Sequence, residues 1–126
     1  MREIGIAIDL GTSGIRGQAI NLKEKKIIST AITMRHPIPG ANVIDHLTFA
    51  TESGGKTAQR IIIDTVNKLL SSLSVDLDQV NRLAVCGNPA QLSMFQNSEI
   101  RDLVIAGQMS QKALGIDHVD RSAKII

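Results

Sequence analysis

The sequence predicts an α/β fold in which three antiparallel strands, a helix and a parallel fourth strand form one layered lobe. Apolar, β-branched segments separated by short turns begin the chain. An amphipathic stretch with helical spacing follows them, and another short apolar segment comes next. With 126 residues, 43% of them hydrophobic, the chain is long enough to bury a real core.

The first three strands are expected at residues 4–8, 15–21 and 27–34, where isoleucine, alanine and threonine are frequent. The loops between these strands are too short for a crossover, so neighbouring strands must run antiparallel. Two prolines, Pro37 and Pro39, then end the antiparallel meander.

A helix is expected over residues 56–73, because apolar residues recur there every three or four positions. Residues 82–87, with the apolar run from Leu83 to Cys86, predict a short buried strand. It should run parallel to the first strand, since a helix connects the two. Cys86, the only cysteine, lies in this strand. We expect it to be a buried, unreactive thiol that has no partner for an internal disulfide.

Two more helices are expected toward the end of the chain. One begins at Pro89, and the other spans about residues 99–114 before Gly115 ends it. This order of elements is the ribonuclease-H-like pattern. We expect residues 1–121 to form one such lobe and residues 122–126 to connect it to the rest of a larger protein.

The turn after the first strand carries the clearest functional signal. Asp9 lies at the end of the strand and is followed by Gly11, Thr12, Ser13 and Gly14. The glycines are expected to allow positive φ and close approach to an anion, with hydroxyl and N–H donors between them. Asp9 would hold hydrated Mg²⁺ beside the phosphates. Because the turn leads into a second strand, the sequence predicts a nucleotide-phosphate site at a hairpin tip.

Several residues near this turn have two interpretations. Arg16 could reach a phosphate, but strand alternation is equally consistent with a solvated side chain. Asn88 follows Gly87 at the end of the parallel strand, where open sheets bind ligands, so it could orient an attacking water. An Asn before a proline is also a common turn residue. Thr12 and Ser13 could simply cap their turn.

Composition argues against several functions. The net charge is only +2 and the basic residues are scattered, with Phe49 and Phe95 as the sole aromatics, so nucleic-acid binding is not expected. There is no secretion signal and no apolar run near the ~20 residues of a membrane span, so we expect a cytoplasmic protein without membrane contact. The histidines lack metal-ligand spacing, which leaves nucleotide-bound Mg²⁺ as the one expected metal.

The motif from Asp9 to Ser13 resembles the first phosphate motif of the sugar kinase, actin and chaperone ATPase superfamily. In that superfamily a D-x-G-T-S/T hairpin grips the β- and γ-phosphates of ATP. The resemblance implies a ribonuclease-H-like lobe and Mg·ATP as cofactor, bound between this lobe and a second one. The chain is too short for both lobes, so we expect an N-terminal fragment that is inactive alone.

Two further stretches, 40–47 and 85–92, resemble the ATP-dependent reductive activases of corrinoid proteins, especially those of the methylamine methyltransferases of methanogens. These ATPases reduce cob(II)amide to cob(I)amide for methyl transfer. The resemblance implies a corrinoid protein and the remaining lobe as partners, and it leaves a homodimer open. The iron–sulfur cluster of such activases would lie in the missing part of the parent, since one cysteine cannot hold it.

These observations together assign the site. Asp9 and Asn88 are the expected catalytic residues, and Asp9 is also the expected metal ligand. The residues expected to bind the nucleotide are Gly11, Thr12, Ser13, Gly14, Arg16 and Gly87. The alternatives are the N-terminal lobe of a carbohydrate kinase and a non-catalytic interaction lobe. A carbohydrate kinase would need polar sugar-binding side chains after the third strand, where residues 40–42 are Gly-Ala-Asn.

Overall fold

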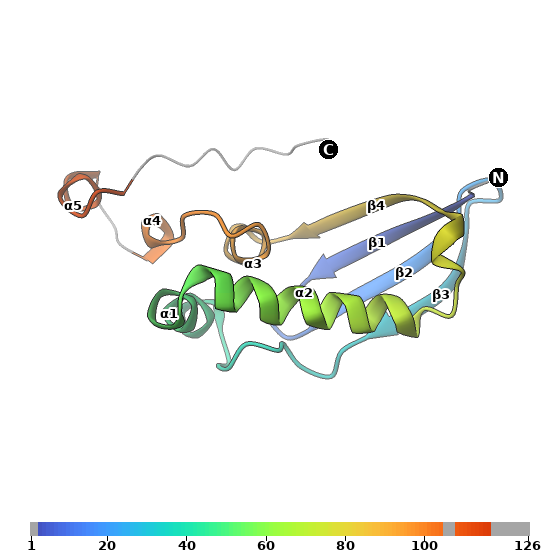
Figure 1. The fold of residues 1–126 in the computed structure, drawn as a ribbon, viewed down its shortest axis with the longest axis horizontal. Helices are drawn as coiled ribbons and strands as arrows, with labels where there is room; N and C mark the ends of the chain where they lie inside the picture. Colours follow the sequence, from blue (N-terminus) through green and yellow to red (C-terminus); the bar gives the residue numbers. More distant parts are fainter. Residues whose placement is uncertain (1–2, 105–107, 117–126) are drawn as a thin grey trace.

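The computed structural model of the chain describes residues 3–104 and 108–116 (Figure 1). In chain order the elements are β1 (Ile4–Leu10), β2 (Ile15–Asn21), β3 (Lys26–Ile32), α1 (Val43–Ser53), α2 (Gly55–Ser72), the 3₁₀ turn η1 (Leu77–Gln79), β4 (Val80–Gly87), α3 (Pro89–Phe95), α4 (Arg101–Val104) and α5 (Gln108–Ala113). The expected boundary between a lobe at 1–121 and a connector at 122–126 lies outside the described residues.

The strands form one four-stranded mixed sheet in the order β3-β2-β1-β4. β1 pairs antiparallel with β2, and β2 pairs antiparallel with β3. β4 runs parallel to β1. This arrangement confirms the predicted α/β lobe, with its antiparallel meander, parallel fourth strand and packed helices. The strand ends shift slightly, since β1 continues to Leu10 and β3 ends at Ile32.

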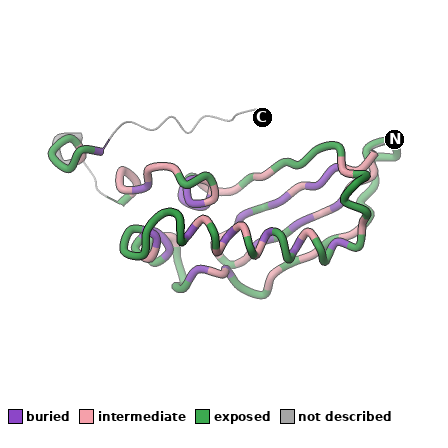
Figure 2. The backbone as a smooth tube through the Cα atoms, in the orientation of Figure 1, coloured by how far each residue is buried: buried purple, intermediate pink, exposed green. Residues whose placement is uncertain are grey.

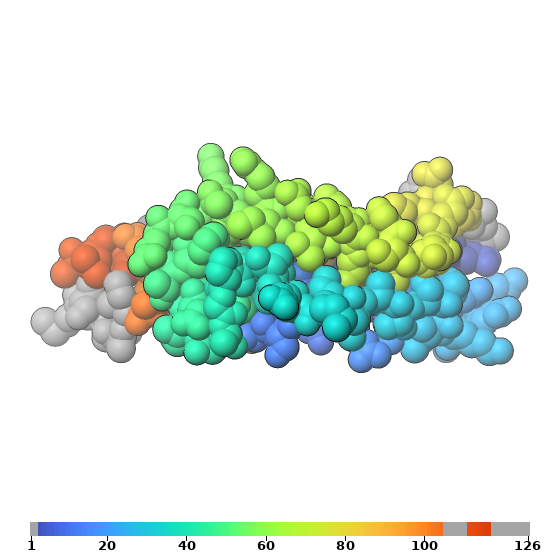
Figure 3. Space-filling view, turned by 90° about the horizontal axis from the view of Figure 1, so that it is seen from below, coloured from blue at the N-terminus to red at the C-terminus, as the bar shows by residue number. Residues whose placement is uncertain are grey.

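The core lies between the sheet and α2, which runs along one face of the sheet (Figure 1). Ile8 and Leu10 of β1 are buried in one cluster with Ile62 and Leu69 of α2. The same buried stretches of the central strands appear in Figure 2, and Figure 3 shows the helix as a separate layer above β3. A Cβ added to Gly17 of β2 would lie 2.3 Å from Leu69 Cδ2. Glycine at this position therefore lets the helix lie close to the sheet.

The prediction of a buried fourth strand is wrong. β4 lies at the edge of the sheet, and its residues from 81 to 84 are exposed. Cys86 is exposed as well, so the expected burial of its thiol is also wrong. The apolar run indicated burial on both faces. Within the described residues, however, β4 has no neighbour beyond it, and of its side chains Val80 and Val85 pack against the core.

Helix α1 was not predicted from the sequence. It begins after Asn42, whose side-chain oxygen accepts a hydrogen bond from the Asp45 backbone N–H at 2.9 Å. This bond satisfies one of the N–H groups that have no partner inside the first turn of a helix. The buried residues His46, Leu47 and Ala50 attach α1 to the core.

The expected helix over residues 99–114 is described as two helices, α4 and α5, and residues 105–107 between them lie outside the described residues. Gly115 has φ = 71°, a conformation typical of the residue that ends a helix, as expected. No helix in the described part of the chain is long and apolar enough to cross a membrane.

The burial of α2 leads to a stability prediction. Leu69→Ala should lower the free energy of unfolding by about 2–5 kcal/mol, because it leaves a cavity between helix and sheet. The matched control is Leu77→Ala, which alters a leucine that is 49% exposed and should cost less than about 1 kcal/mol. Urea unfolding measures both changes. Equal losses in the two variants would contradict the packing described here.

Candidate functional site

The hairpin tip between β1 and β2 is closed by a backbone hydrogen bond, in which the Gly11 N–H donates to the Gly14 carbonyl at 3.0 Å. A Cβ on Gly11 would lie 2.8 Å from the Gly14 oxygen, and a Cβ on Gly14 would lie 2.9 Å from the Thr33 oxygen. Both positions therefore exclude a side chain for lack of space. The expectation of positive φ here is wrong, because the described glycines with positive φ lie elsewhere in the chain.

Thr33, immediately after β3, fixes the end of the tip. Its side-chain Oγ1 accepts a hydrogen bond from the Ile15 N–H at 2.8 Å, and its own N–H donates to the Ile15 carbonyl at 2.9 Å. Thr33 therefore joins the start of β2, directly after the hairpin tip, to the end of β3 by two hydrogen bonds. A loop fixed in this way presents its N–H groups and hydroxyls without having to be ordered by a ligand.

Asp9 and Arg16 lie on the sheet face that α2 does not cover. They are direct partners across β1 and β2, and Cys86 is the partner of Asp9 on β4. These three exposed residues line a hollow of about 340 Å³ together with Ala7, Ile8 and Gln18. A carboxylate is an oxygen ligand suited to Mg²⁺, and a guanidinium can pair with a phosphate oxygen. The described residues contain no group of three or more side chains arranged as metal ligands.

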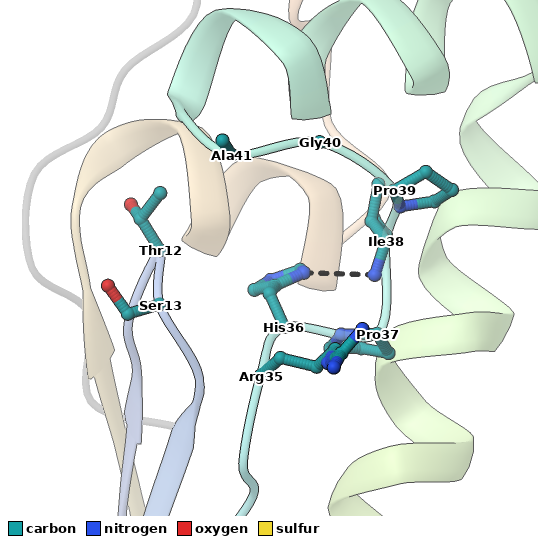
Figure 4. A pocket seen from close by; sticks show the side chains of 9 residues that line it. All are labelled: Thr12, Ser13, Arg35, His36, Pro37, Ile38, Pro39, Gly40 and Ala41. Carbon is teal, nitrogen blue, oxygen red and sulfur yellow. Dashed lines mark hydrogen bonds between the residues drawn. The ribbon is translucent and has the colours of Figure 1, made fainter.

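Thr12 and Ser13 line a different pocket of about 380 Å³, whose other residues are 35–41 (Figure 4). In Figure 4 the Arg35 side chain extends toward Pro37 and away from the two hydroxyl groups. The structure thus divides the predicted site residues between two sides of the hairpin tip. The hydroxyl residues share one pocket, whereas Asp9 and Arg16 share the hollow on the open sheet face.

Gly87 and Asn88 connect β4 to this tip. A Cβ on Gly87 would lie 2.9 Å from the Leu10 oxygen, so this glycine permits β4 to end close against β1. The Asn88 side chain caps α3 by accepting a hydrogen bond from the Gln91 N–H at 2.9 Å, and its Nδ2 donates to Thr12 Oγ1 at 3.2 Å. Asn88 is therefore a helix cap that also contacts the predicted phosphate loop.

A buried polar network, not predicted from the sequence, lies behind the pocket. The His36 and His46 rings stack with centroids 4.3 Å apart, and Gln91 bridges them. Gln91 Oε1 lies 2.6 Å from His36 Nε2, and Gln91 Nε2 lies 3.0 Å from His46 Nδ1. The segment 36–40 completes the network, because the Ile38 N–H donates to His36 Nδ1 at 3.1 Å and His46 Nε2 lies 3.2 Å from the Gly40 oxygen.

The pKa of His36 is lowered from 6.5 to about 4, mainly by burial and also by the nearby His46, while the bond to Gln91 acts in the opposite direction. No local sequence pattern signals this network, since the bonded side chains are separated by 45 and 55 positions. Only the chain topology brings them together.

The fold, with its glycine-bounded hairpin tip, defines the chain as a mixed α/β lobe with two hollows beside that tip. A solved structure of a reductive activator for corrinoid, iron–sulfur protein has this fold. It is similar with a TM-score of 0.71 and 24% identity, over 79% of this chain and 17% of that one.

The sequence comparisons are more specific. Residues 4–116 match the family described as "RACo middle region". The "[Co(II) methylated amine-specific corrinoid protein] reductase" of Methanosarcina barkeri is 54% identical over 121 residues, which are 96% of this chain and 22% of that protein. The chain therefore belongs to the RACo middle region family, and the resemblance to corrinoid-protein reductive activases is confirmed. It spans about a fifth of the curated relative's length.

The two hydrogen bonds of Asn88 can be separated by mutation. Asn88→Ser retains a capping oxygen but cannot reach Thr12, whereas Asn88→Ala loses both interactions. We expect Asn88→Ala to be about 1 kcal/mol less stable than Asn88→Ser, because the serine can still cap α3. Thermal unfolding of the two variants measures this difference. A serine variant no more stable than the alanine variant would contradict the capping role.

The lowered pKa of His36 predicts a pH dependence of stability. The unfolded chain binds a proton at this side chain near pH 6.5, whereas the folded chain binds it only near pH 4. The free energy of unfolding should therefore fall, by up to about 3 kcal/mol in all, as the pH decreases from 6.5 to about 4. Urea titrations across this range measure the slope.

A second group, Glu99, limits the pH range over which the free energy of unfolding reports on His36. The pKa of Glu99 is lowered from 4.5 to about 2, mainly by its hydrogen bond with Arg101, so this group costs stability only below pH 4.5. The range from pH 6.5 to 4.5 therefore reports on the histidine. A free energy that stays constant over this range would rule out a buried neutral His36.

Proposed function

We propose that this chain is the phosphate-binding part of an ATPase that drives reductive activation of a corrinoid protein. In this reaction one electron from a low-potential donor converts Co(II) of the corrinoid to Co(I), the state required for methyl transfer from methylamines. The observation that carries the proposal is the 54% identity to a reductase whose name specifies a methylated amine-specific corrinoid protein.

The hairpin tip supports phosphate binding. Gly11 and Gly14 carry no side chains, so the backbone of residues 12 and 13 between them can lie close to an anion. The hydroxyls of Thr12 and Ser13 add donors on the pocket side of the tip. These groups fit the terminal phosphates of a nucleotide. They would act by aligning the phosphates and neutralising their charge, on which phosphoryl transfer mainly depends.

Asp9 fits a role in holding hydrated Mg²⁺. Its exposed carboxylate lies at the end of β1 and lines the hollow on the open sheet face together with Arg16. When bound, Mg²⁺ would neutralise phosphate charge and orient the nucleotide. Arg16 would supply a second positive group on the same side, where a guanidinium can pair with a phosphate oxygen.

Asn88 and Gly87 complete the proposed site. Asn88 holds Thr12 through its Nδ2 group, and from the same position it could orient the water that attacks the nucleotide. Gly87 brings the end of β4 against Leu10, so that Asn88 lies beside the tip. Gly87 would thus contribute by close packing, and its backbone would face the nucleotide.

ATP can favour cobalt reduction only if it binds two conformations of the whole protein with different affinities. We propose that closure of a second lobe around Mg·ATP changes the surface presented to the corrinoid protein. That lobe and an iron–sulfur cluster would be supplied by the remainder of a longer protein, in accordance with the small share of the relative that this chain spans. The chain alone would not be competent.

The test is reductive activation by the full-length protein that carries this chain. We expect Asp9→Asn to abolish ATP-dependent conversion of the cob(II)amide spectrum to the cob(I)amide spectrum, because Mg²⁺ loses its carboxylate ligand. The control is Asp64→Asn, which alters an exposed carboxylate on α2 and should retain the conversion. Conversion by the unaltered protein that does not need ATP would overturn the proposed function. Full ATP-dependent activity in Asp9→Asn would remove Asp9 from the mechanism.

A further inference from the structure

In the buried network behind the pocket, a donor and an acceptor can be assigned to every hydrogen bond. The Ile38 N–H donates to His36 Nδ1, so the proton of the neutral His36 ring is on Nε2 and is donated to Gln91 Oε1. The Gln91 amide nitrogen donates to His46 Nδ1, and His46 Nε2–H donates to the Gly40 carbonyl. Both histidines are therefore neutral with the proton on Nε2. The chain of bonds begins and ends on the same segment, 36–40.

Gln91 joins this segment to the hairpin tip. Its side chain holds His36 and His46, while its backbone N–H donates to Asn88, which in turn donates to Thr12. Residues 35–41 and the tip residues Thr12 and Ser13 are opposite sides of one pocket. One buried residue on α3 thus connects both sides, and no buried side-chain polar atom among the described residues lacks a partner.

We propose that Gln91 is a positioning residue that holds segment 36–40 against the hairpin tip, and that it does so only while His36 and His46 are neutral. This inference rests on the proposed function for the identity of the ligand, the phosphates of Mg·ATP. Protonation of either histidine would add a proton to Nδ1, where a donor N–H already points. Two donors would then face each other in a buried site, and the segment would be released from the tip.

The charged groups around the network do not provide an alternative partner for that proton. Directly before the segment lies Arg35, which is exposed and positive. On α1 the carboxylates are Asp45 and Glu52, both exposed, and Asp45 accepts a hydrogen bond from the Ala41 N–H at 3.0 Å. Helix α3 carries no charged residue, and the charged residues of α2 are exposed. The second histidine is therefore the nearest titratable group to the first.

Two substitutions at Gln91 test the proposal in the full-length protein. Gln91→Leu removes both side-chain bonds and should raise the KM for Mg·ATP roughly tenfold at neutral pH, with a smaller change in kcat. Gln91→Glu can accept from His36 but has no proton for His46 Nδ1. It should therefore bind Mg·ATP less tightly than the unaltered protein at neutral pH, whereas the unaltered protein should lose binding only as the pH falls toward 4, where His36 gains its second proton. The control is Gln96→Leu, an exposed glutamine at the end of the same helix.

A readout independent of activity is the ¹⁵N spectrum of the imidazole rings. We expect His36 and His46 both to carry the proton on Nε2 alone at pH 7 in the unaltered protein, because a donor N–H points at each Nδ1. The Thr12 amide resonance should shift in Gln91→Leu and stay unchanged in Gln96→Leu. These spectra remain decisive if Gln91→Leu fails to fold, because they also apply to the unaltered protein and to Gln91→Glu.

The possible outcomes separate this inference from the proposed function. A proton on Nδ1 of either histidine at pH 7 would overturn the positioning role, whatever the activity. An unchanged KM and pH profile in folded Gln91→Leu and Gln91→Glu would also overturn it. If the unaltered protein needs no ATP for activation, the proposed function fails while the spectra still decide the role of Gln91.

Discussion

Three backbone segments converge at the carboxyl ends of β1 and β4 so closely that no side chain fits between them. At Gly11, Gly14 and Gly87 an added Cβ would lie 2.8 to 2.9 Å from a backbone carbonyl oxygen. Contacts this short with rigid backbone cannot be relieved by a change of rotamer. The hairpin tip, the end of β3 and the start of α3 therefore have their relative positions because these three residues are glycines.

This convergence places the polar residues of the proposed site. Because β4 ends against Leu10, Asn88 begins α3 beside the tip and reaches Thr12. Because the chain after β3 runs past the same tip, His36 lies near Gln91 of α3. The two helices α1 and α3 thus meet at the edge of the sheet where the proposed phosphates would bind. A longer protein would supply the second side of that site.

Periodicity and motif spacing predicted the parts of the structure that depend on local pattern. The meander, α2 and the hairpin tip at Gly11 to Gly14 follow from residues close together in sequence. Helix α1 has 11 residues, and the prolines before it indicated only the end of the meander. The apolar composition of β4 indicated burial, but its edge position leaves Cys86 exposed. An edge position depends on which strands are neighbours, and composition does not encode it.

Prediction of the site was limited in the same way. The motif identified Thr12 and Asn88 separately, and the hydrogen bond between them spans 76 positions. The motif also grouped Asp9 and Thr12 in one site, whereas in the structure Asp9 lines the hollow on the open sheet face and Thr12 lines the other pocket. The histidine network joins residues of three separate segments. It requires the complete packing of α1 and α3, so no single stretch of sequence could reveal it.

We infer that the hairpin tip holds the phosphates of a metal-bound nucleotide. The most direct measurement replaces Mg²⁺ with paramagnetic Mn²⁺ in the ATP complex of the full-length protein and records which backbone amide resonances broaden. We expect the strongest broadening at residues 9–14, with Asp9→Asn removing it. Broadening confined to residues outside the tip, with residues 9–14 unaffected, would contradict the account.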